Sequence, residues 1–176
     1  MSFPRLRASL AIAFSFLMAI TVAIIAVLHD SQADADVGAG CPKGMTEVRL
    51  TLPKEAGQVK LRIINGTRTE GLAVQVSEEF KNRGFAVQKP LQSANELHAD
   101  IAVIYFGPET VGAAQWIQAF FLGEATSQFN RSRTGDVIDV TLGDRYRELA
   151  STTEVNQAMA QLGEPKLPPG TCRTLR

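Results

Sequence analysis

The chain has 176 residues, with 18 basic and 18 acidic side chains and a formal net charge of zero. This length accommodates one domain and a short additional segment. Proteins that bind nucleic acid by counterion release need a concentrated basic face, which this composition does not indicate, so we expect no nucleic-acid partner.

A long apolar segment lies near the N-terminus. Residues 8–28 contain no charged residue, Pro or Gly. At 1.5 Å per residue a helix of this length spans about 31 Å, close to the thickness of a hydrocarbon core. Arg5 and Arg7 precede the segment, whereas Asp30 and Asp34 follow it. The positive-inside rule therefore predicts a transmembrane helix with its N-terminus in the cytoplasm.

The predicted organisation is a cytoplasmic tail at residues 1–7, a transmembrane helix at 8–28, a linker at 29–46 and an extracytoplasmic domain at 47–176. A cleaved signal peptide is the alternative, because residues 33–35 read Ala-Asp-Ala and resemble a small-x-small cleavage site. The apolar segment is, however, longer than the usual core of a signal peptide. We therefore expect an uncleaved anchor.

Two cysteines flank the predicted domain, Cys41 and Cys172. Outside the cytoplasm an even number of cysteines indicates a disulfide bond, so we expect Cys41 to pair with Cys172. The alternative is two unpaired thiols. Two distant cysteines and a lone His98 do not have the spacing of metal ligands, so we expect no metal site and no cofactor.

The first half of the domain shows clear periodicity. Alternation predicts an edge strand at residues 48–52 and a second strand at 59–63, followed by a turn at Asn65-Gly66-Thr67. Apolar residues at helical spacing predict a helix over residues 71–83, for which Gly84 provides a left-handed end.

In the second half, each further element has its own signal in the sequence. The expected elements are a short strand at 85–89, a nearly continuous apolar strand at 99–106, a helix opened by Pro108 and reaching Phe121, a polar loop at 123–135, a strand at 137–142 and a helix at 151–162. Ser151 and Glu154 have the spacing of a capping box. An irregular tail is expected beyond this last helix.

The element order, strand-helix-strand twice over, predicts an α/β (α+β) domain. We expect the ferredoxin-like split βαβ arrangement, with a mixed or antiparallel sheet and two helices on one face. A doubly wound parallel sheet is the alternative. It is disfavoured because residues 87–100 contain no crossover helix, which a parallel connection requires.

Three segments of the chain carry a resemblance to a known family, namely VKLRIINGTRTEGLAVQVSEEFKNRGFAV, ADIAVIYFGPETVGAAQWI and DVIDVTLGDRY. Together they cover Val59 to Tyr146 and resemble the C-terminal domain of LytR-CpsA-Psr envelope proteins. Those proteins also carry a large catalytic domain, for which this chain has no room, so the resemblance does not imply transferase chemistry. A short anchored chain with one such domain resembles actinobacterial envelope integrity proteins, which implies a role in the permeability barrier.

Two groups of residues are candidate binding sites. Trp116 and Phe120 form a second apolar pair on their helix, and they belong either to ordinary packing or to a surface for a lipid-like ligand or an envelope protein partner. Asn65, Thr67 and Arg68 lie between a strand and a helix N-terminus. They form either an anion site or a tight turn in which Thr67 or Thr69 caps the helix.

No pairing of a nucleophile with a base is visible in the sequence. His98 and Asp144 have no evident catalytic partner, so we expect a protein that is not an enzyme. Four arginines, at positions 131, 133, 145 and 147, either gather at one end of the sheet or lie on a solvated face. The leading hypothesis is therefore a membrane-anchored binding module that maintains envelope integrity. The alternative is an accessory subunit of a wall-polymer ligase or a periplasmic enzyme.

Overall fold

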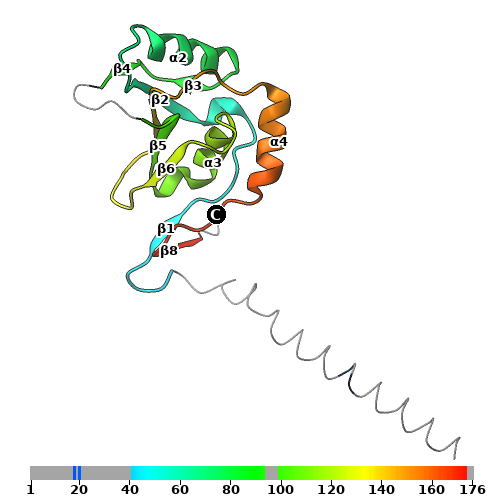
Figure 1. Ribbon diagram of the computed structural model, residues 1–176. Coiled ribbons are helices and arrows are strands. Elements are labelled where there is room, and N and C mark those ends of the chain that lie inside the picture. The colour runs from blue at the N-terminus through cyan, green and yellow to red at the C-terminus, as the bar shows by residue number, and fades with distance from the viewer. Residues whose placement is uncertain (1–17, 19, 21–40, 94–98, 174–176) are drawn as a thin grey trace, which may run out of the picture. The chain divides into compact units, whose positions relative to one another are not determined.

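The computed structural model describes residues 18, 20, 41–93 and 99–173. Residues from Cys41 onward form one compact unit, and Figure 1 labels most of its helices and strands. The predicted transmembrane helix at residues 8–28 lies outside the described residues except for Met18 and Ile20, which are helical. Among the residues that are described, no helix combines the length and the apolar character needed to cross a membrane.

A six-stranded mixed sheet forms the centre of the domain. Its strands are β3 (Ala86–Val87), β2 (Lys60–Asn65), β7 (Val137–Leu142), β5 (Ala102–Phe106) and β6 (Thr126–Phe129) in that spatial order, while β4 (Leu91–Gln92) also pairs with β2. β2 runs parallel to β3, β4 and β7, and β5 runs parallel to β6. One antiparallel pairing, between β5 and β7, joins the two halves.

The helices α2 (Leu72–Asn82), α3 (Val111–Ala119) and α4 (Thr152–Leu162) follow their predicted ranges closely. Short 3₁₀ turns precede β2 and α3, namely η1 (Ala56–Gln58) and η2 (Pro108–Thr110). Gly84 has φ 88°, as expected for the left-handed end of α2. The capping box of α4 is present, with the Ser151 amide donating to Glu154 Oε2 at 2.8 Å.

The predicted split βαβ topology is wrong, although the mixed sheet is confirmed. In a split unit, another strand lies between the two strands that the helix connects. Here β2 and β3, which α2 connects, pair directly, and so do β5 and β6 on either side of α3. The segment expected to be a polar loop contains β6. This extra strand pairs directly with β5, so β5, α3 and β6 form a βαβ unit with no strand between its two strands.

One face of the sheet packs against the helices. Leu61, Ile63, Ile138 and Val140 lie on this face in register and are fully buried. Phe80 of α2 packs against Phe120, at the end of α3, with ring centroids 5.3 Å apart. Therefore α2 and α3 cover the same face, and α4 packs against α3.

A separate two-stranded sheet joins the two ends of the domain. β1 (Thr46–Val48) pairs in parallel with β8 (Thr171–Arg173), where an edge strand of the main sheet and an irregular tail were predicted. The expected disulfide bond is confirmed, because Cys41 is bonded to Cys172 with 5.8 Å between their Cα atoms. The bond closes a loop of sequence separation 131, which contains the whole sheet.

Candidate functional site

A row of polar side chains crosses the sheet on the face opposite the helices. Strand register places Arg62 of β2 beside Asp139 of β7, Asp139 beside Tyr105 of β5, and Tyr105 beside Gln128 of β6. Successive side chains of a strand point to opposite faces, so these four alternate with the buried residues of the core face. We call Arg62, Asp139, Tyr105 and Gln128 the polar row.

Asp139 is the buried member of the polar row, with 6% of its surface exposed. Its carboxylate accepts hydrogen bonds from Arg62 Nε at 2.7 Å, Arg62 Nη2 at 2.8 Å and Arg133 Nη2 at 2.6 Å. Burial raises the pKa of Asp139, but the hydrogen bonds and charges of the two guanidinium groups outweigh it and hold the pKa below its ordinary value. Two cations around one anion leave a local charge of about +1.

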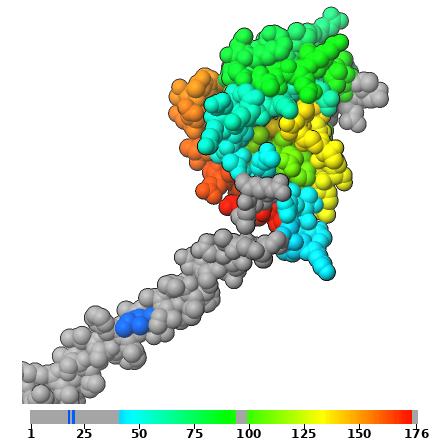
Figure 2. Space-filling model, turned by 180° about the vertical axis from the view of Figure 1, so that it is seen from behind, coloured from blue at the N-terminus to red at the C-terminus, as the bar shows by residue number. Residues whose placement is uncertain are grey.

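A hollow of about 540 Å³ opens next to the polar row. Tyr105, Pro169, Gln128, Asn130 and Arg131 line it together with Phe129, whose ring packs against Phe106 on the core face. No carboxylate belongs to this lining. The segment around residue 130, coloured yellow in Figure 2, lies at the surface of the domain. We call this cavity the ring-lined hollow; its polar groups can donate and accept hydrogen bonds, and its net charge is positive.

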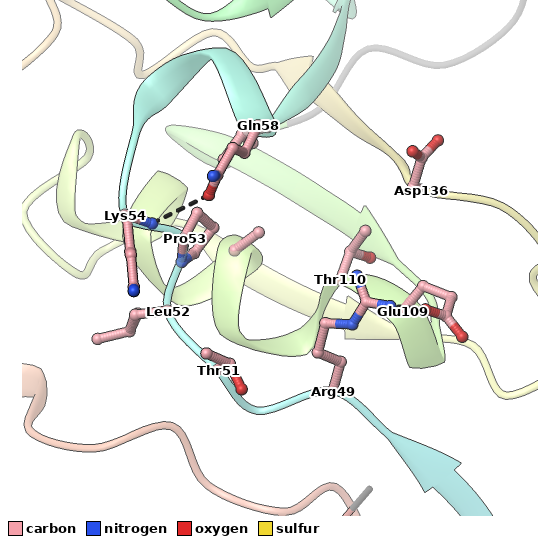
Figure 3. Close-up of a pocket in the computed structure, with 11 residues that line it drawn as sticks. Arg49, Thr51, Leu52, Pro53, Lys54, Gln58, Glu109, Thr110 and Asp136 are labelled. Atoms are coloured by element: carbon pink, nitrogen blue, oxygen red, sulfur yellow. Dashed lines mark hydrogen bonds and ion pairs between the residues drawn. The ribbon is translucent and has the colours of Figure 1, made fainter. Parts of the chain in front are cut away.

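A second hollow, of about 410 Å³, lies between residues 49–54, η1 and the start of α3 (Figure 3). Arg49 pairs with Glu109 at 2.9 Å, and Asp136 pairs with Lys60 at 2.7 Å. Figure 3 shows Lys54 near Gln58, whose side-chain oxygen accepts a hydrogen bond from the Lys54 amide at 3.1 Å. The charges of its four ionisable lining residues, Arg49, Lys54, Glu109 and Asp136, sum to zero, so the lining has no net charge to select a ligand.

The structure places Phe120 in the core. Its side chain is 5% exposed and packs against Phe80 and Phe85, while the Arg83 guanidinium lies 5.3 Å from its ring centroid. Trp116 is half-buried against Phe85, with 5.3 Å between ring centroids. The burial of Phe120 favours the packing alternative, because the rings of Phe80 and Phe85 contact its ring, whereas Trp116 stays a candidate.

The Asn65-Gly66-Thr67 segment is a tight turn that uses its own polar groups. Asn65 is 2% exposed; its Oδ1 accepts from the Thr67 amide at 3.0 Å and from Thr67 Oγ1 at 2.8 Å. Asn65 Nδ2 donates to the Thr69 carbonyl oxygen and to Gln92 Oε1. Arg68 is exposed. The N-cap of α2 is Gly71 and not Thr67 or Thr69, since the turn holds both threonines outside the helix.

The four arginines considered from the sequence do not gather at one end of the sheet. Arg131 and Arg133 precede β7, whereas Arg145 and Arg147 follow it. A six-residue strand separates the two pairs by roughly 20 Å. Asp144 is exposed beyond β7, and His98 lies outside the described residues.

Sequence reasoning did not find the polar row as a site. In β2 and β7 apolar residues alternate with polar ones, so Arg62 and Asp139 fall on the face away from the core. A charged residue in the middle of each strand was the sequence feature that could have indicated the site. Only strand order and register reveal that the two residues are partners. Tyr105 and Gln128 were missed for the same reason, because β6 was expected to be a loop.

Comparisons with known proteins give one family and one solved structure. Residues 58–146 match the family described as LytR cell envelope-related transcriptional attenuator. The crystal structure of the soluble domain of a conserved hypothetical secreted protein from Mycobacterium marinum has a TM-score of 0.47 and 24% sequence identity, and the likeness covers 69% of this chain and 82% of that chain. No curated protein matches the chain.

Proposed function

We propose, from the premise that this chain belongs to the LytR cell envelope-related family, that it is a non-enzymatic protein of the cell envelope. Its domain binds an envelope ligand or protein partner and thereby helps to maintain the permeability barrier. The family match confirms the resemblance of Val59 to Tyr146, on which this expectation was first based.

The state of Asp139 is the observation that supports binding over catalysis. It is the carboxylate of the polar row, yet it accepts three hydrogen bonds from two guanidinium groups and its pKa is lowered. A general acid or base at neutral pH needs a pKa near the operating pH, which requires a shift in the opposite direction. Asp139 is therefore suited to positioning arginines for a ligand and not to proton transfer.

The disulfide bond supports a location outside the cytoplasm. Such bonds persist in oxidising compartments and are rare in the cytosol. Residues 8–28 then serve as the membrane anchor, with residues 1–7 in the cytoplasm. The Cys41–Cys172 bond holds the two ends of the domain together.

The experiment removes the protein from its own cells and measures the uptake of large and of apolar antibiotics. We expect increased uptake, restored by the full chain. A chain in which a cleavable signal peptide replaces residues 1–28 should restore less, because it is exported but no longer held at the membrane. Unchanged uptake after deletion contradicts the proposal. Reduced attachment of wall polymer, measured in the same cells, would instead favour the accessory subunit of a ligase.

The anchor is tested separately by fractionation. We expect the full chain to stay with membranes after carbonate extraction. A mature protein that begins after Ala35 would show that the segment is a cleaved signal peptide.

A further inference from the structure

We infer that the ring-lined hollow and the adjoining polar row bind an anionic saccharide, a sugar unit that carries a carboxylate or a phosphate. This inference rests on the proposed function and names the ligand class of that same site. Three properties of the site lead to this inference. Its rings can pack against a sugar, its carboxamides can bond to hydroxyl groups, and its lining contains an arginine but no carboxylate.

The rings match the apolar part of a sugar. Tyr105 and Pro169 contribute flat apolar surface to the hollow, whereas the ring of Phe129 packs against its register partner Phe106 on the core face, with 5.8 Å between ring centroids. A pyranose presents one face of C–H bonds that packs against such rings, while its hydroxyl groups remain at the rim. Pockets for small ligands are typically lined in this way, by apolar surface with a few polar groups that fix orientation.

The carboxamides match the hydroxyl groups. Gln128 and Asn130 each carry a donor and an acceptor, as does a sugar hydroxyl. Asn130 is held in place, because its Oδ1 accepts a hydrogen bond from the Ser132 amide at 2.9 Å. This bond leaves the amide nitrogen of Asn130 as the available donor of that side chain.

The charge selects an acidic sugar over a neutral one. Arg131 lines the hollow itself, and the Arg62–Asp139–Arg133 cluster beside it has an excess of one positive charge. Arg62 uses two of its five N–H donors on Asp139, which leaves others for a ligand. Guanidinium groups bind carboxylate and phosphate through paired hydrogen bonds. The site has an excess of only a few positive charges, which can neutralise a single anionic group. A polyanion such as nucleic acid needs many more cations.

The test uses the full chain in detergent micelles and four probes: glucuronic acid, glucose 1-phosphate, glucose and inorganic phosphate. Binding is followed by NMR chemical shifts of labelled protein. We expect the two acidic sugars to bind more tightly than glucose and than phosphate alone, with shifts at Tyr105 and Gln128. The acidic sugar that binds more tightly shows whether the site prefers a carboxylate or a phosphate. Equal binding of glucose contradicts the role of charge, and equal binding of phosphate contradicts the role of the rings.

Two variants and one control locate the site. Arg131→Ala should weaken the binding of acidic sugars by about tenfold or more, as expected for a lost hydrogen bond to a charged group. Gln128→Ala, at an exposed strand position, should weaken the binding of acidic sugars and of glucose together. Arg145→Ala, at the other end of β7, should leave binding unchanged. Equal losses in the Arg145→Ala and Arg131→Ala variants would overturn the inference.

Cell measurements separate this inference from the proposed function. If deletion makes cells leaky but none of the four probes binds, the saccharide inference fails and the proposed function stands. If acidic sugars bind at the ring-lined hollow but deletion leaves the barrier intact, the barrier role fails and the ligand class stands. If both hold, cells that carry Arg131→Ala should be leakier than cells that carry Arg145→Ala.

Discussion

Arg62 and Asp139 face each other across adjacent parallel strands, with two guanidinium nitrogens 2.7 and 2.8 Å from the two carboxylate oxygens. The same carboxylate also accepts a hydrogen bond from Arg133, which lies in the connection between β6 and β7. One buried side chain thus ties β2, β7 and this connection together. The orientation of Arg62 and Arg133 depends on it.

The first prediction concerns Asp139→Asn. This variant should lower the free energy of unfolding by about 1–3 kcal/mol at neutral pH, because two partly exposed arginines lose a buried ionic partner. The folded-state pKa of Asp139 is lowered, so its contribution is complete above the ordinary pKa of about 3.9 and is lost as the pH falls through the folded pKa. Denaturant unfolding at several pH values measures this.

The difference between wild type and Asp139→Asn should therefore shrink in acid. Asp136→Asn is the matched control, since the Asp136–Lys60 pair is exposed and its loss should change stability little. A difference between wild type and Asp139→Asn that stays constant down to the strongest acid would contradict the role assigned to the ion pair.

The second prediction concerns the disulfide bond. Replacing Cys41 and Cys172 with Ala should lower the free energy of unfolding by about 4–5 kcal/mol in the chain-entropy model, since the bond closes a loop of sequence separation 131. The fold type should persist, because the core residues of the main sheet do not include the bridge. Circular dichroism with denaturant titration tests both parts. Loss of the native spectrum would show that the sheet needs the bridge.

The third prediction separates Phe120 from Trp116. Phe120→Ala should cost about 3–5 kcal/mol, because its ring is 5% exposed and contacts both Phe80 and Phe85. Trp116→Ala should cost less, since Trp116 is only half-buried. Unfolding midpoints of the two variants give the comparison. A Phe120→Ala protein as stable as wild type would restore the earlier hypothesis of a binding surface there.

Periodicity and capping signals predicted most elements of this fold, but not how the strands pair. The helices, the Gly84 helix end and the Ser151–Glu154 box depend on local interactions, which short segments of sequence contain. β6 carries no alternating apolar pattern, because Ser127 and Gln128 are both exposed on an edge strand. The polar row was hidden for a related reason, since its members come from four strands and become neighbours only through register.

The fourth prediction concerns the turn after β2. Asn65→Ala should cost about 1–3 kcal/mol, because it leaves buried donors and acceptors of the turn without their partners. Arg68→Ala, three residues further on and exposed, should change stability by less than about 0.5 kcal/mol. Thermal unfolding of both variants measures the contrast. Equal effects would mean that the Asn65 network is not what holds the turn.

The last prediction concerns Gly112, near the start of α3. Its amide donates to the Arg49 carbonyl oxygen at 3.1 Å, and the Arg49 amide donates to the Pro108 carbonyl oxygen at 2.8 Å. A Cβ atom at Gly112 would collide with the backbone carbonyl oxygens of Leu50 and Thr51, which cannot turn aside as the tip of a flexible side chain can. Gly112→Ala should therefore push residues 49–53 away from α3 and cost about 1–3 kcal/mol.

The same displacement should alter the hollow of Figure 3, because Arg49 and Thr51 line it. Gly57→Ala is the matched control: its added Cβ would lie 3.7 Å from the nearest heavy atom outside its chain neighbours, the Gly84 carbonyl oxygen, which is ordinary contact. NMR shifts should change along residues 49–53 in Gly112→Ala, whereas Tyr105 and Gln128 on the far face of the sheet keep theirs. If Gly112→Ala unfolds like wild type and leaves those shifts unchanged, the close approach of this segment to α3 does not stabilise the domain.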